Sequence, residues 1–391
     1  MADFALPTRN TRRLLLSMIV LGFIARVALS WFSLGSTDFA TWQGFGRLIN
    51  ERGLYSAYAA DPLLNHPPLP ALWSAAALQL AAKWNVLFSF IFRLPAIFAD
   101  VGSALVLYRI GQARSGTGLR AAAWMSWSLP AILIGAYHCN TDNICAFFAL
   151  LSAHLLAGPV SPLLAGVTLA VAINVKIIPL LLVPLLVAAC PDRRSLLRFA
   201  IGLTLGLTPI FIALVGAGRP MLENVFHYKS MMGQWGVMYF FMELSGNAYW
   251  SGAGIACVDW YYANGRFVLL AAVTLMSLAA VVFRRWSALE LAAIGIGLFL
   301  ILAPGFGAQY LVYAVPVMFA IDLRRAASYS LVAGLCLLVI YVGYWTGTVP
   351  MRSEFGIGLP PPASLFGLLA WGVLVAFVYR TIVSPATGRS S

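Results

Sequence analysis

The sequence alternates between long apolar runs and short polar segments that carry most of its charge. A run of about 20 apolar residues is as long as a helix must be to cross the roughly 30 Å hydrocarbon core of a bilayer. Charged residues make up only 10% of the chain, against about 25% in a typical soluble domain. So little charge cannot cover a surface that faces water. We therefore expect an all-α bundle of transmembrane helices.

Twelve segments have the length and apolarity of membrane-spanning helices. They are approximately residues 14–33, 90–108, 120–137, 142–157, 161–175, 177–190, 198–217, 266–283, 287–304, 308–322, 327–346 and 363–380. No internal repeat or coiled-coil period divides them, so residues 1–391 are predicted to form a single domain. The first apolar run is too long for a typical signal peptide and is expected to remain as an uncleaved span.

Arginine residues cluster on alternate segments between the predicted spans, which is the positive-inside pattern of membrane proteins. This pattern places both termini in the cytoplasm and leaves two long loops outside, approximately residues 34–89 and 218–265. The net charge of +12 is therefore explained by the arginines of the cytoplasmic segments. No basic patch alternates with stacking aromatic residues in a soluble segment, so nucleic-acid binding is not expected.

One apolar stretch, Leu69–Ala82, is excluded from the spans by its length and by the charge pattern. Its residues would rise only about 21 Å as a helix, less than the roughly 30 Å of the hydrocarbon core. If it spanned, every later loop would change sides, and twelve arginines would face outward in exchange for four basic residues. We predict that this stretch is a re-entrant or interfacial helix of the first outer loop. The four basic residues on the outer side are Arg219, Lys229, Arg266 and Arg352.

The same outer loop contains an amphipathic segment that begins at Asp38 and predicts a helix lying in the membrane interface. Its apolar face is formed by Phe39, Trp42, Gly46 and Ile49. The Asp38 carboxylate could cap this helix, or it could take a proton from an incoming hydroxyl group. Position alone favours capping only slightly.

His66 precedes two prolines in the segment Asn65-His66-Pro67-Pro68-Leu69. The prolines fix an extended backbone just before the predicted re-entrant helix. A lone histidine is more often structural than functional. Because this one lies on a stiff segment of the same loop as Asp38, we include it among the candidate binding residues.

Two more charged residues lie where the predicted helices approach the outer face. Asp142 follows the short turn that begins at His138, and it can favour a helix dipole or contact a substrate. Lys176 lies inside unbroken apolar sequence, where a charge is costly and is usually functional. Pro179 interrupts the helix close by. Residues 161–190 are therefore expected to form two short helices that meet near the outer face, with Lys176 available to an anion.

Asp100 is a second charge within a predicted span. It could be an intramembrane counterpart of Lys176 or a partner of Arg93, and a structural pairing is the favoured interpretation because charges inside a bundle are usually paired.

Neither a metal nor a cofactor is expected. The five cysteines show no CxxC motif and no ligand-like spacing with histidine, so they are interpreted as small buried apolar residues. No cluster of carboxylates is spaced to bind Mg²⁺.

Taken in order, these segments resemble the GT-C superfamily of polyprenyl-phosphate-sugar-dependent glycosyltransferases, over approximately residues 10–320. Asp38 resembles the acidic residue that the family uses as its base. The stretch that ends at Asp100 resembles the family's second span, with its arginine and intramembrane aspartate. The remaining matches are His66-Pro67-Pro68-Leu69 with Tyr/His-Pro-Pro-Leu, His138-Cys-Asn-Thr-Asp142 with Gly-Gln-x-Asp, Lys176-Ile-Ile-Pro179-Leu with Lys-x-x-Pro-Leu, and Gln309-Tyr310 to Pro316 with Tyr-Leu-x-x-x-x-Pro. Asn140 stands where the family usually has glutamine.

The resemblance implies a GT-C fold and an inverting transfer of a sugar from a polyprenyl-phosphate donor at the extracytoplasmic face. Asp38 would deprotonate the acceptor hydroxyl. The leaving polyprenyl phosphate is already an anion, so it needs positive groups and no protonating acid. The candidates for binding the donor phosphate or another part of the substrate are His66, Asp142, Lys176, Arg219, His227, Lys229, Tyr310 and Arg352.

The transferred sugar is expected to be a hexose or pentose, with mannose favoured, and the acceptor to be a lipid-linked glycan, a glycolipid or a protein. The composition suggests an enzyme of the bacterial inner membrane that faces the periplasm. A transporter or flippase for a lipid-linked or sugar substrate is an alternative, although such proteins typically contain internal repeats. An O-antigen ligase or polymerase is a third candidate.

Overall fold

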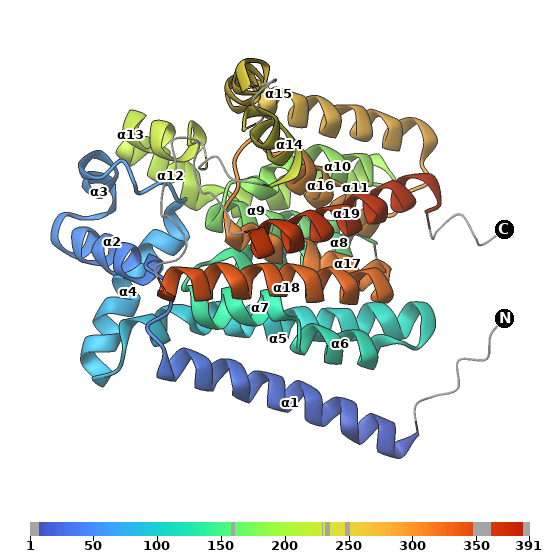
Figure 1. Cartoon of the computed structure of the whole chain (residues 1–391), viewed down its shortest axis with the longest axis horizontal. Coiled ribbons are helices and arrows are strands. Elements are labelled where there is room, and N and C mark those ends of the chain that lie inside the picture. Colours follow the sequence, from blue (N-terminus) through green and yellow to red (C-terminus); the bar gives the residue numbers. More distant parts are fainter. Residues whose placement is uncertain are drawn as a thin grey trace.

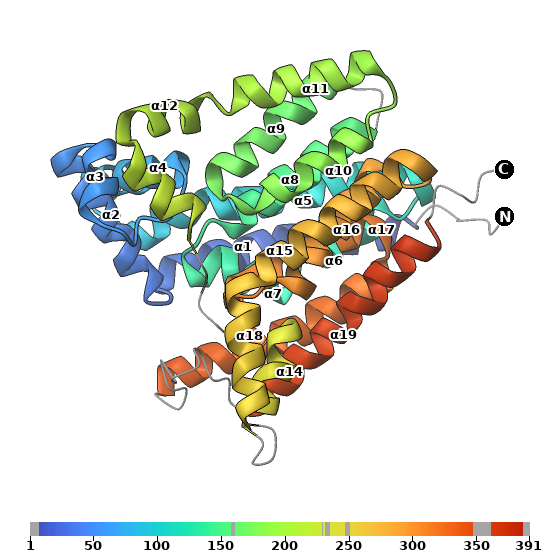
Figure 2. The same cartoon turned by 90° about the horizontal axis from the view of Figure 1, so that it is seen from above.

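The computed structural model describes residues 8–157, 161–228, 230, 235–246, 251–346 and 361–385. These residues contain helices and no strand, as the sequence predicts (Figures 1 and 2). The helices are α1 (Arg9–Phe32), α2 (Asp38–Arg52), α3 (Leu54–Ala60), α4 (Pro68–Trp84), α5 (Phe88–Ser115), α6 (Gly118–Ser126), α7 (Leu129–Ile132), η1 (Leu133–His138), α8 (Asp142–Ala157), α9 (Pro162–Val175), η2 (Ile178–Leu181), α10 (Leu182–Ala188), α11 (Arg193–Gly206), α12 (Thr208–Ala217), α13 (Arg219–Met221), η3 (Leu222–Phe226), α14 (Gly236–Ser245), α15 (Ser251–Phe283), α16 (Ala288–Leu302), η4 (Ala308–Val312), α17 (Ala314–Ile321), α18 (Leu323–Thr346) and α19 (Pro361–Val383).

Within the described ranges, five helices are long and apolar enough to cross a membrane, namely α1, α5, α15, α18 and α19. The pair α11 and α12, bent by 43°, would make a sixth. Most of the other predicted spans fall on apolar helices of 10–17 residues, such as α8, α9 and α16. A helical membrane fold is therefore confirmed, while the count of twelve spans and the single domain stay predictions.

The two ends of the bundle differ in character. The start of α1 and the end of α19 lie together at one end, whereas α2, α3 and α4 gather at the opposite end (Figure 1). This is the arrangement that the predicted topology requires. The helix predicted from Asp38 forms as α2 and buries most of the expected apolar face, with Trp42, Phe45, Gly46 and Ile49 turned inward.

Helix α4 is the apolar stretch that the charge pattern excluded from the spans. It packs against α2 so closely that a Cβ on Gly46 would lie 2.7 Å from the carbonyl oxygen of Ser74. Asn50 of α2 links the pair further, because it donates to the Ala75 carbonyl at 3.2 Å and accepts from Gln79 at 2.8 Å. These contacts make the first outer loop a folded unit on which Asp38 is fixed.

The second predicted outer loop is mostly helical, because α15 begins at Ser251, well before the predicted span start at residue 266. The first half of α15 packs against α14 (Figure 2). A small apolar cluster holds the two helices together, formed by Met238, Met242, Val258 and Tyr261. Burial against α14 therefore extends the helix beyond the purely apolar run that the sequence pattern selects.

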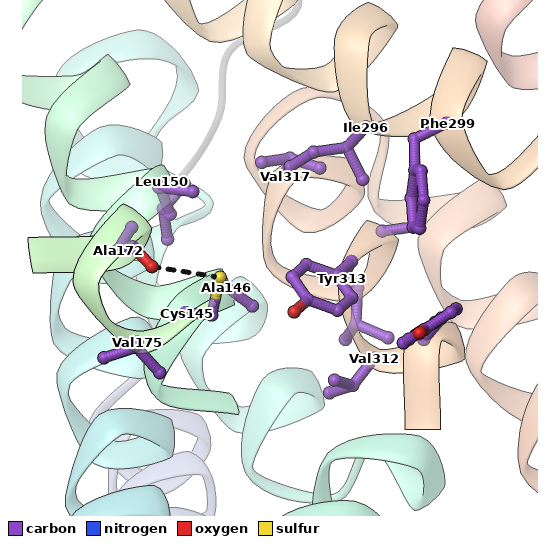
Figure 3. Close-up of a cluster of buried hydrophobic side chains, with 14 of the residues drawn as sticks. Cys145, Ala146, Leu150, Ala172, Val175, Ile296, Phe299, Val312, Tyr313 and Val317 are labelled. Atoms are coloured by element: carbon purple, nitrogen blue, oxygen red, sulfur yellow. Dashed lines mark hydrogen bonds between the residues drawn. The ribbon is translucent and has the colours of Figure 1, made fainter. Parts of the chain in front are cut away.

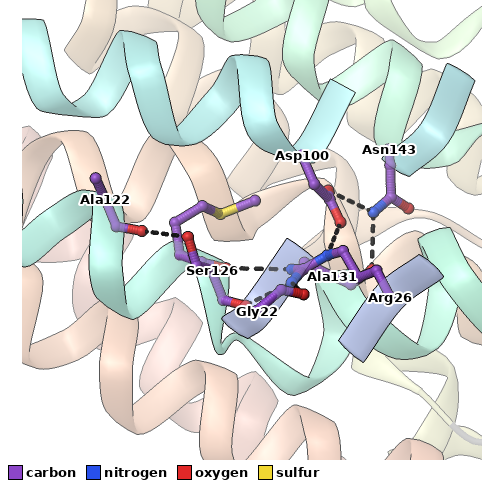
Figure 4. A network of polar contacts seen from close by, with 8 residues as sticks. Gly22, Arg26, Asp100, Ala122, Ser126, Ala131 and Asn143 are labelled. Atoms are coloured by element: carbon purple, nitrogen blue, oxygen red, sulfur yellow. Dashed lines mark hydrogen bonds and ion pairs between the residues drawn. The ribbon is translucent and has the colours of Figure 1, made fainter. Parts of the chain in front are cut away.

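A buried ion pair joins the first two long helices. Arg26 of α1 donates to Asp100 of α5 with an Nε–Oδ2 distance of 2.8 Å, and neither side chain is more than 4% exposed. Asn143 of α8 donates to the other Asp100 oxygen at 2.7 Å, and Arg26 also reaches the Ser126 carbonyl (Figure 4). The structural pairing expected for Asp100 is confirmed, but its partner is Arg26 and the expectation of Arg93 is wrong.

Arg93 instead closes the end of α1. Seven residues along a helix separate it from Asp100 by about 10 Å, so the two side chains do not meet. Its buried guanidinium donates to carbonyl oxygens at the end of α1, namely those of Ser30 at 3.2 Å, Ser33 at 2.9 Å and Leu34. These carbonyls would otherwise be unsatisfied at the helix terminus. Arg93 thereby fixes the connection from α1 to α2.

Gly35 lies inside this connection with a φ of +92°, a conformation that residues with a side chain rarely adopt. A Cβ at this position would overlap the Arg93 guanidinium and the carbonyl oxygen of Tyr137. The next residue, Ser36, donates to the His138 carbonyl at 2.6 Å. The segment before α2 is therefore pressed against η1.

Replacing Asp100 with leucine is expected to destabilise the bundle by about 3–5 kcal/mol, because the buried Arg26 charge loses its partner. The double variant Arg26→Met/Asp100→Leu is expected to recover most of this loss, since it buries no charge. Thermal unfolding in detergent, followed by tryptophan fluorescence, measures both. A single variant that unfolds at the original temperature would show that the pair is not structurally important.

Gly35→Ala is expected to destabilise the protein by at least about 1–3 kcal/mol, because alanine strains the backbone and collides with Arg93. Gly44→Ala in α2 is the matched control, since nothing lies within 4 Å of the added Cβ. Alanine favours a helix over glycine by about 0.5–1 kcal/mol, so the control is expected to be neutral or stabilising. Equal unfolding temperatures for the two variants would contradict this account of Gly35.

Candidate active site

A cavity of about 320 Å³ lies beside α2 and collects residues from segments that are far apart in the sequence. Four predicted site residues line it, namely Asp38, His66, Lys176 and Tyr310. Asp142, a fifth, lies behind Lys176 and contacts it. The structure therefore brings together five of the nine candidates, from the first outer loop, the start of α8, the α9–η2 break and η4.

Asp38 is the first residue of α2, and its carboxylate points away from its own helix terminus. Oδ2 accepts a hydrogen bond from Asn140 Nδ2 at 2.9 Å and lies 3.2 Å from His138 Nε2. The backbone N–H of Asp38 is bonded by Ser36 Oγ at 3.3 Å. The capping interpretation of Asp38 is therefore wrong, because the side chain binds the turn before α8 instead.

The surroundings of Asp38 keep its carboxylate ionised. Burial raises the pKa of Asp38, but the charge of His138 and the hydrogen bond from His138 lower it, followed by the charge of Lys176 and the bond from Asn140. The net pKa lies below its usual value of 3.8. Because 36% of the side chain is exposed, the carboxylate is accessible as a proton acceptor at neutral pH.

Lys176 lies where α9 ends, in a break that the sequence predicts from Pro179. Its Nζ lies 2.7 and 2.9 Å from the two carboxylate oxygens of Asp142, the first residue of α8. The Nζ is also 5.3 Å from the centre of the Tyr310 ring. Pairing with Asp142 offsets the cost of burying the ammonium, which remains on the cavity wall.

His66 faces the cavity as a neutral group. Its ring packs against Trp42 with centroids 4.5 Å apart, and its carbonyl accepts from the Tyr58 hydroxyl at 2.7 Å. Burial lowers the pKa of His66 to about 3, and the charge of Lys176 acts in the same direction. His66 is therefore a hydrogen-bonding residue at physiological pH and supplies no positive charge to a phosphate.

Of the other predicted cations, the two that the structure describes, Arg219 and His227, do not line this cavity. Arg219 lies on α13 with 85% of its side chain exposed and pairs with Glu223 at 2.7 Å. His227 is exposed just after η3. Lys229 and Arg352 lie outside the described residues. Charge and sidedness place such residues in an outer loop without fixing the direction in which their side chains point.

An apolar cavity of about 580 Å³ adjoins the first one, bordered by α10, α15 and α16. The two cavities share four lining residues, which form their junction: Ile177, Ile178, Tyr228 and Tyr310. Most of the second cavity is lined by aliphatic and aromatic side chains, but Arg266 of α15 also lies on its wall. The polar cavity therefore continues into an apolar one that carries a cation.

A packed apolar core holds the helix ends that carry the Lys176–Asp142 ion pair. Cys145 and Ala146 of α8 face Tyr313, which lies between η4 and α17, and the Cys145 thiol lies 3.7 Å from the Ala172 carbonyl of α9 (Figure 3). The same carbonyl accepts from the Lys176 backbone N–H at 2.9 Å. This contact between α8 and α9 fixes the helix ends that carry Asp142 and Lys176.

Sequence reasoning missed three contributors to the site. His138 and Asn140, which contact Asp38, were noticed only as neighbours of Asp142, although polar residues between two apolar runs are a usable signal. Arg266 was placed outside but was not selected, although it begins the apolar run of the eighth predicted span. No group of three or more His, Cys, Asp or Glu side chains suited to a metal occurs in the part of the chain that the structure describes.

Comparison with known proteins bears on the fold. No protein-family model matches the sequence, and no curated protein matches it. The crystal structure of ArnT from Cupriavidus metallidurans, bound to undecaprenyl phosphate, matches 96% of this chain and 78% of its own, with a TM-score of 0.51 and 14% sequence identity. The chain therefore shares the fold of ArnT.

Proposed function

We propose that the protein is a glycosyltransferase that moves a sugar from a polyprenyl-phosphate donor to an acceptor hydroxyl. One observation carries the proposal: an ionised carboxylate and a buried ammonium, Asp38 and Lys176, line one polar cavity that continues into an apolar one. A polyprenyl-phosphate sugar has the same division, with an apolar chain, an anion and a polar head. ArnT, which shares the fold, was crystallised with undecaprenyl phosphate.

The two cavities suggest how the donor binds. The prenyl chain occupies the apolar cavity, whose aliphatic lining favours burial of hydrocarbon. The phosphate lies at the junction beside Tyr310, within reach of Lys176 on one side and Arg266 on the other. The sugar then extends into the polar cavity toward Asp38 and His66.

The reaction follows from this placement. Asp38 takes the proton of the acceptor hydroxyl, and the acceptor oxygen forms a bond to the anomeric carbon as the bond from that carbon to the phosphate oxygen breaks. Attack from the face opposite the phosphate inverts the anomeric carbon. The released polyprenyl phosphate carries the negative charge, which Lys176 stabilises without giving up a proton. The proton stays on Asp38 until product release.

The finer assignments are part of the same proposal. We assign a hexose or pentose, with mannose first among them, to the sugar and a lipid-linked glycan, a glycolipid or a protein to the acceptor. The inner membrane of a bacterium is the proposed location, with the cavity open to the periplasm. The position of α2, opposite the start of α1 and the end of α19, supports this part of the proposal (Figure 1).

Asp38→Asn is expected to lower sugar transfer by about 100-fold to 10,000-fold, the usual contribution of a general base. The asparagine keeps the size and the contact to Asn140, so the unfolding temperature should change little. Glu51→Gln is the matched control, an exposed carboxylate on the same helix. Transfer is measured in proteoliposomes with radiolabelled polyprenyl-phosphate mannose, glucose and arabinose.

The same assay separates the competing functions. Label transferred to a lipid or protein acceptor supports a glycosyltransferase, whereas label carried across the membrane without transfer supports a transporter or flippase. Near-normal transfer by Asp38→Asn would exclude Asp38 as the base.

Arg266→Gln is expected to raise the KM for the donor about tenfold or more, because a hydrogen bond to a charged group contributes about 1.5–3 kcal/mol. The kcat should change less, since the residue lies away from Asp38. Arg13→Gln, an exposed change at the start of α1, is the control. Arg219→Gln tests a residue that the sequence predicts as a ligand of the donor but that does not line either cavity. An unchanged KM in Arg266→Gln would remove this residue from the phosphate site.

A further inference from the structure

His138 contacts the segment that carries Asp38 in two ways. Its backbone carbonyl accepts a hydrogen bond from Ser36 Oγ at 2.6 Å, and Ser36 Oγ in turn bonds the Asp38 backbone N–H at 3.3 Å. Its ring nitrogen Nε2 lies 3.2 Å from the Asp38 carboxylate. One residue at the end of η1 therefore holds both the backbone and the side chain of Asp38.

The His138 ring is itself held in place. It packs against Tyr341 of α18 with centroids 5.6 Å apart, and only 10% of the side chain is exposed. Both ring nitrogens are buried, and neither has a hydrogen-bond partner of standard geometry among the residues that the structure covers. Nε2 is the ring nitrogen that faces Asp38, 3.2 Å from Oδ2.

The contacts of Asp38 are divided unevenly between its two oxygens. Asn140 and His138 both approach Oδ2, at 2.9 and 3.2 Å. No described residue donates a hydrogen bond to Oδ1. One oxygen is thus anchored to the turn before α8, while the other is left for a group in the cavity.

We propose that His138 is a positioning residue of the active site, which anchors Oδ2 of Asp38 so that Oδ1 faces the acceptor hydroxyl. This inference rests on the proposed function, in which Asp38 is the base. The role requires no contact between His138 and the substrate. It assigns a function to a histidine that lies next to the cavity without lining it.

Among the groups around Asp38, His138 lowers the pKa of the carboxyl group most. Lys176 also acts on the carboxylate, from the α9–η2 break, but its ammonium is bonded to both oxygens of Asp142. His66 approaches from the segment before α4 and is neutral, and the Cys139 thiol is held protonated by burial, which raises its pKa to about 12. Loss of the His138 ring should therefore raise the pKa of Asp38.

The first test reads the carboxylate directly and needs no substrate. The full-length protein is labelled with ¹³Cγ-aspartate in detergent, and the Asp38 resonance is assigned by its loss in Asp38→Asn. In His138→Phe the titration midpoint of Asp38 is expected to rise by about one pH unit or more, because the ring lies within the distance at which an opposite charge lowers the pKa of an acid. In His138→Gln the rise should be smaller, since an amide donor remains.

The second test uses transfer activity as a function of pH. In His138→Phe the acidic limb of the kcat/KM profile should move to higher pH, in step with the Asp38 titration, and kcat should fall at the plateau. His138→Gln should recover part of both changes. His154→Gln on α8, whose side chain is outside both cavities, is the control and should leave the profile unchanged.

The outcomes are distinguishable. An Asp38 titration and an acidic limb that are unchanged in His138→Phe would overturn the role of His138, even with a reduced kcat. Should His138→Phe fail to fold, an unchanged Asp38 midpoint in His138→Gln, together with unchanged kcat, would overturn it equally. Absence of transfer by the unmodified protein would refute the proposed function, while the NMR titration would still report on the contact.

Discussion

The ion pair between Lys176 and Asp142 is the interaction on which the site depends. An ammonium inside an apolar helix bundle is strongly unfavourable unless a carboxylate faces it, and here both oxygens of Asp142 do so. The pair requires α9 to end at Val175 and α8 to begin at Asp142. The shape of the bundle near the cavity therefore follows from the need to pair two charges, and the apolar core around Cys145 and Tyr313 holds the two helix ends together.

Much of this architecture could be predicted because lipid imposes simple rules on sequence. Apolar runs predict the helices, and Pro179 predicts the break after α9. The unequal distribution of arginines between the two sides of the membrane excludes α4 from the predicted spans, and so predicts Asp38 on the same side as Lys176. The pairing of Asp100 could be predicted in kind, since a buried carboxylate needs a partner. The identity of that partner could not, because Arg26 and Asp100 meet only through the packing of α1 against α5.

Other parts of the site depend on geometry that sequence does not encode locally. The π-helical turn of η1 aims the His138 ring, and no residue pattern in 133–138 distinguishes it from an α-helix. His66 was expected to bind the donor phosphate or another part of the substrate, and burial against Trp42, which makes it neutral, is visible only in the structure. Arg219 satisfied the charge pattern but points into solvent. Cavities arise from side chains of several helices, so their lining residues, such as Arg266, become visible only in three dimensions.

The hydrogen bonds from Arg93 to the end of α1 affect the order in which the molecule assembles. The segment before Asp38 is held by a residue about 60 positions later in the chain and by η1 about 100 positions later. Contacts of such sequence separation form late, because the intervening chain must first be ordered. During synthesis, α1 and α2 are therefore made before anything fixes the Asp38 carboxylate at the start of α2. Asp38 reaches its final position only when α5 and η1 have joined α1. If Asp38 is the base, as we propose, a partly inserted chain cannot yet catalyse transfer.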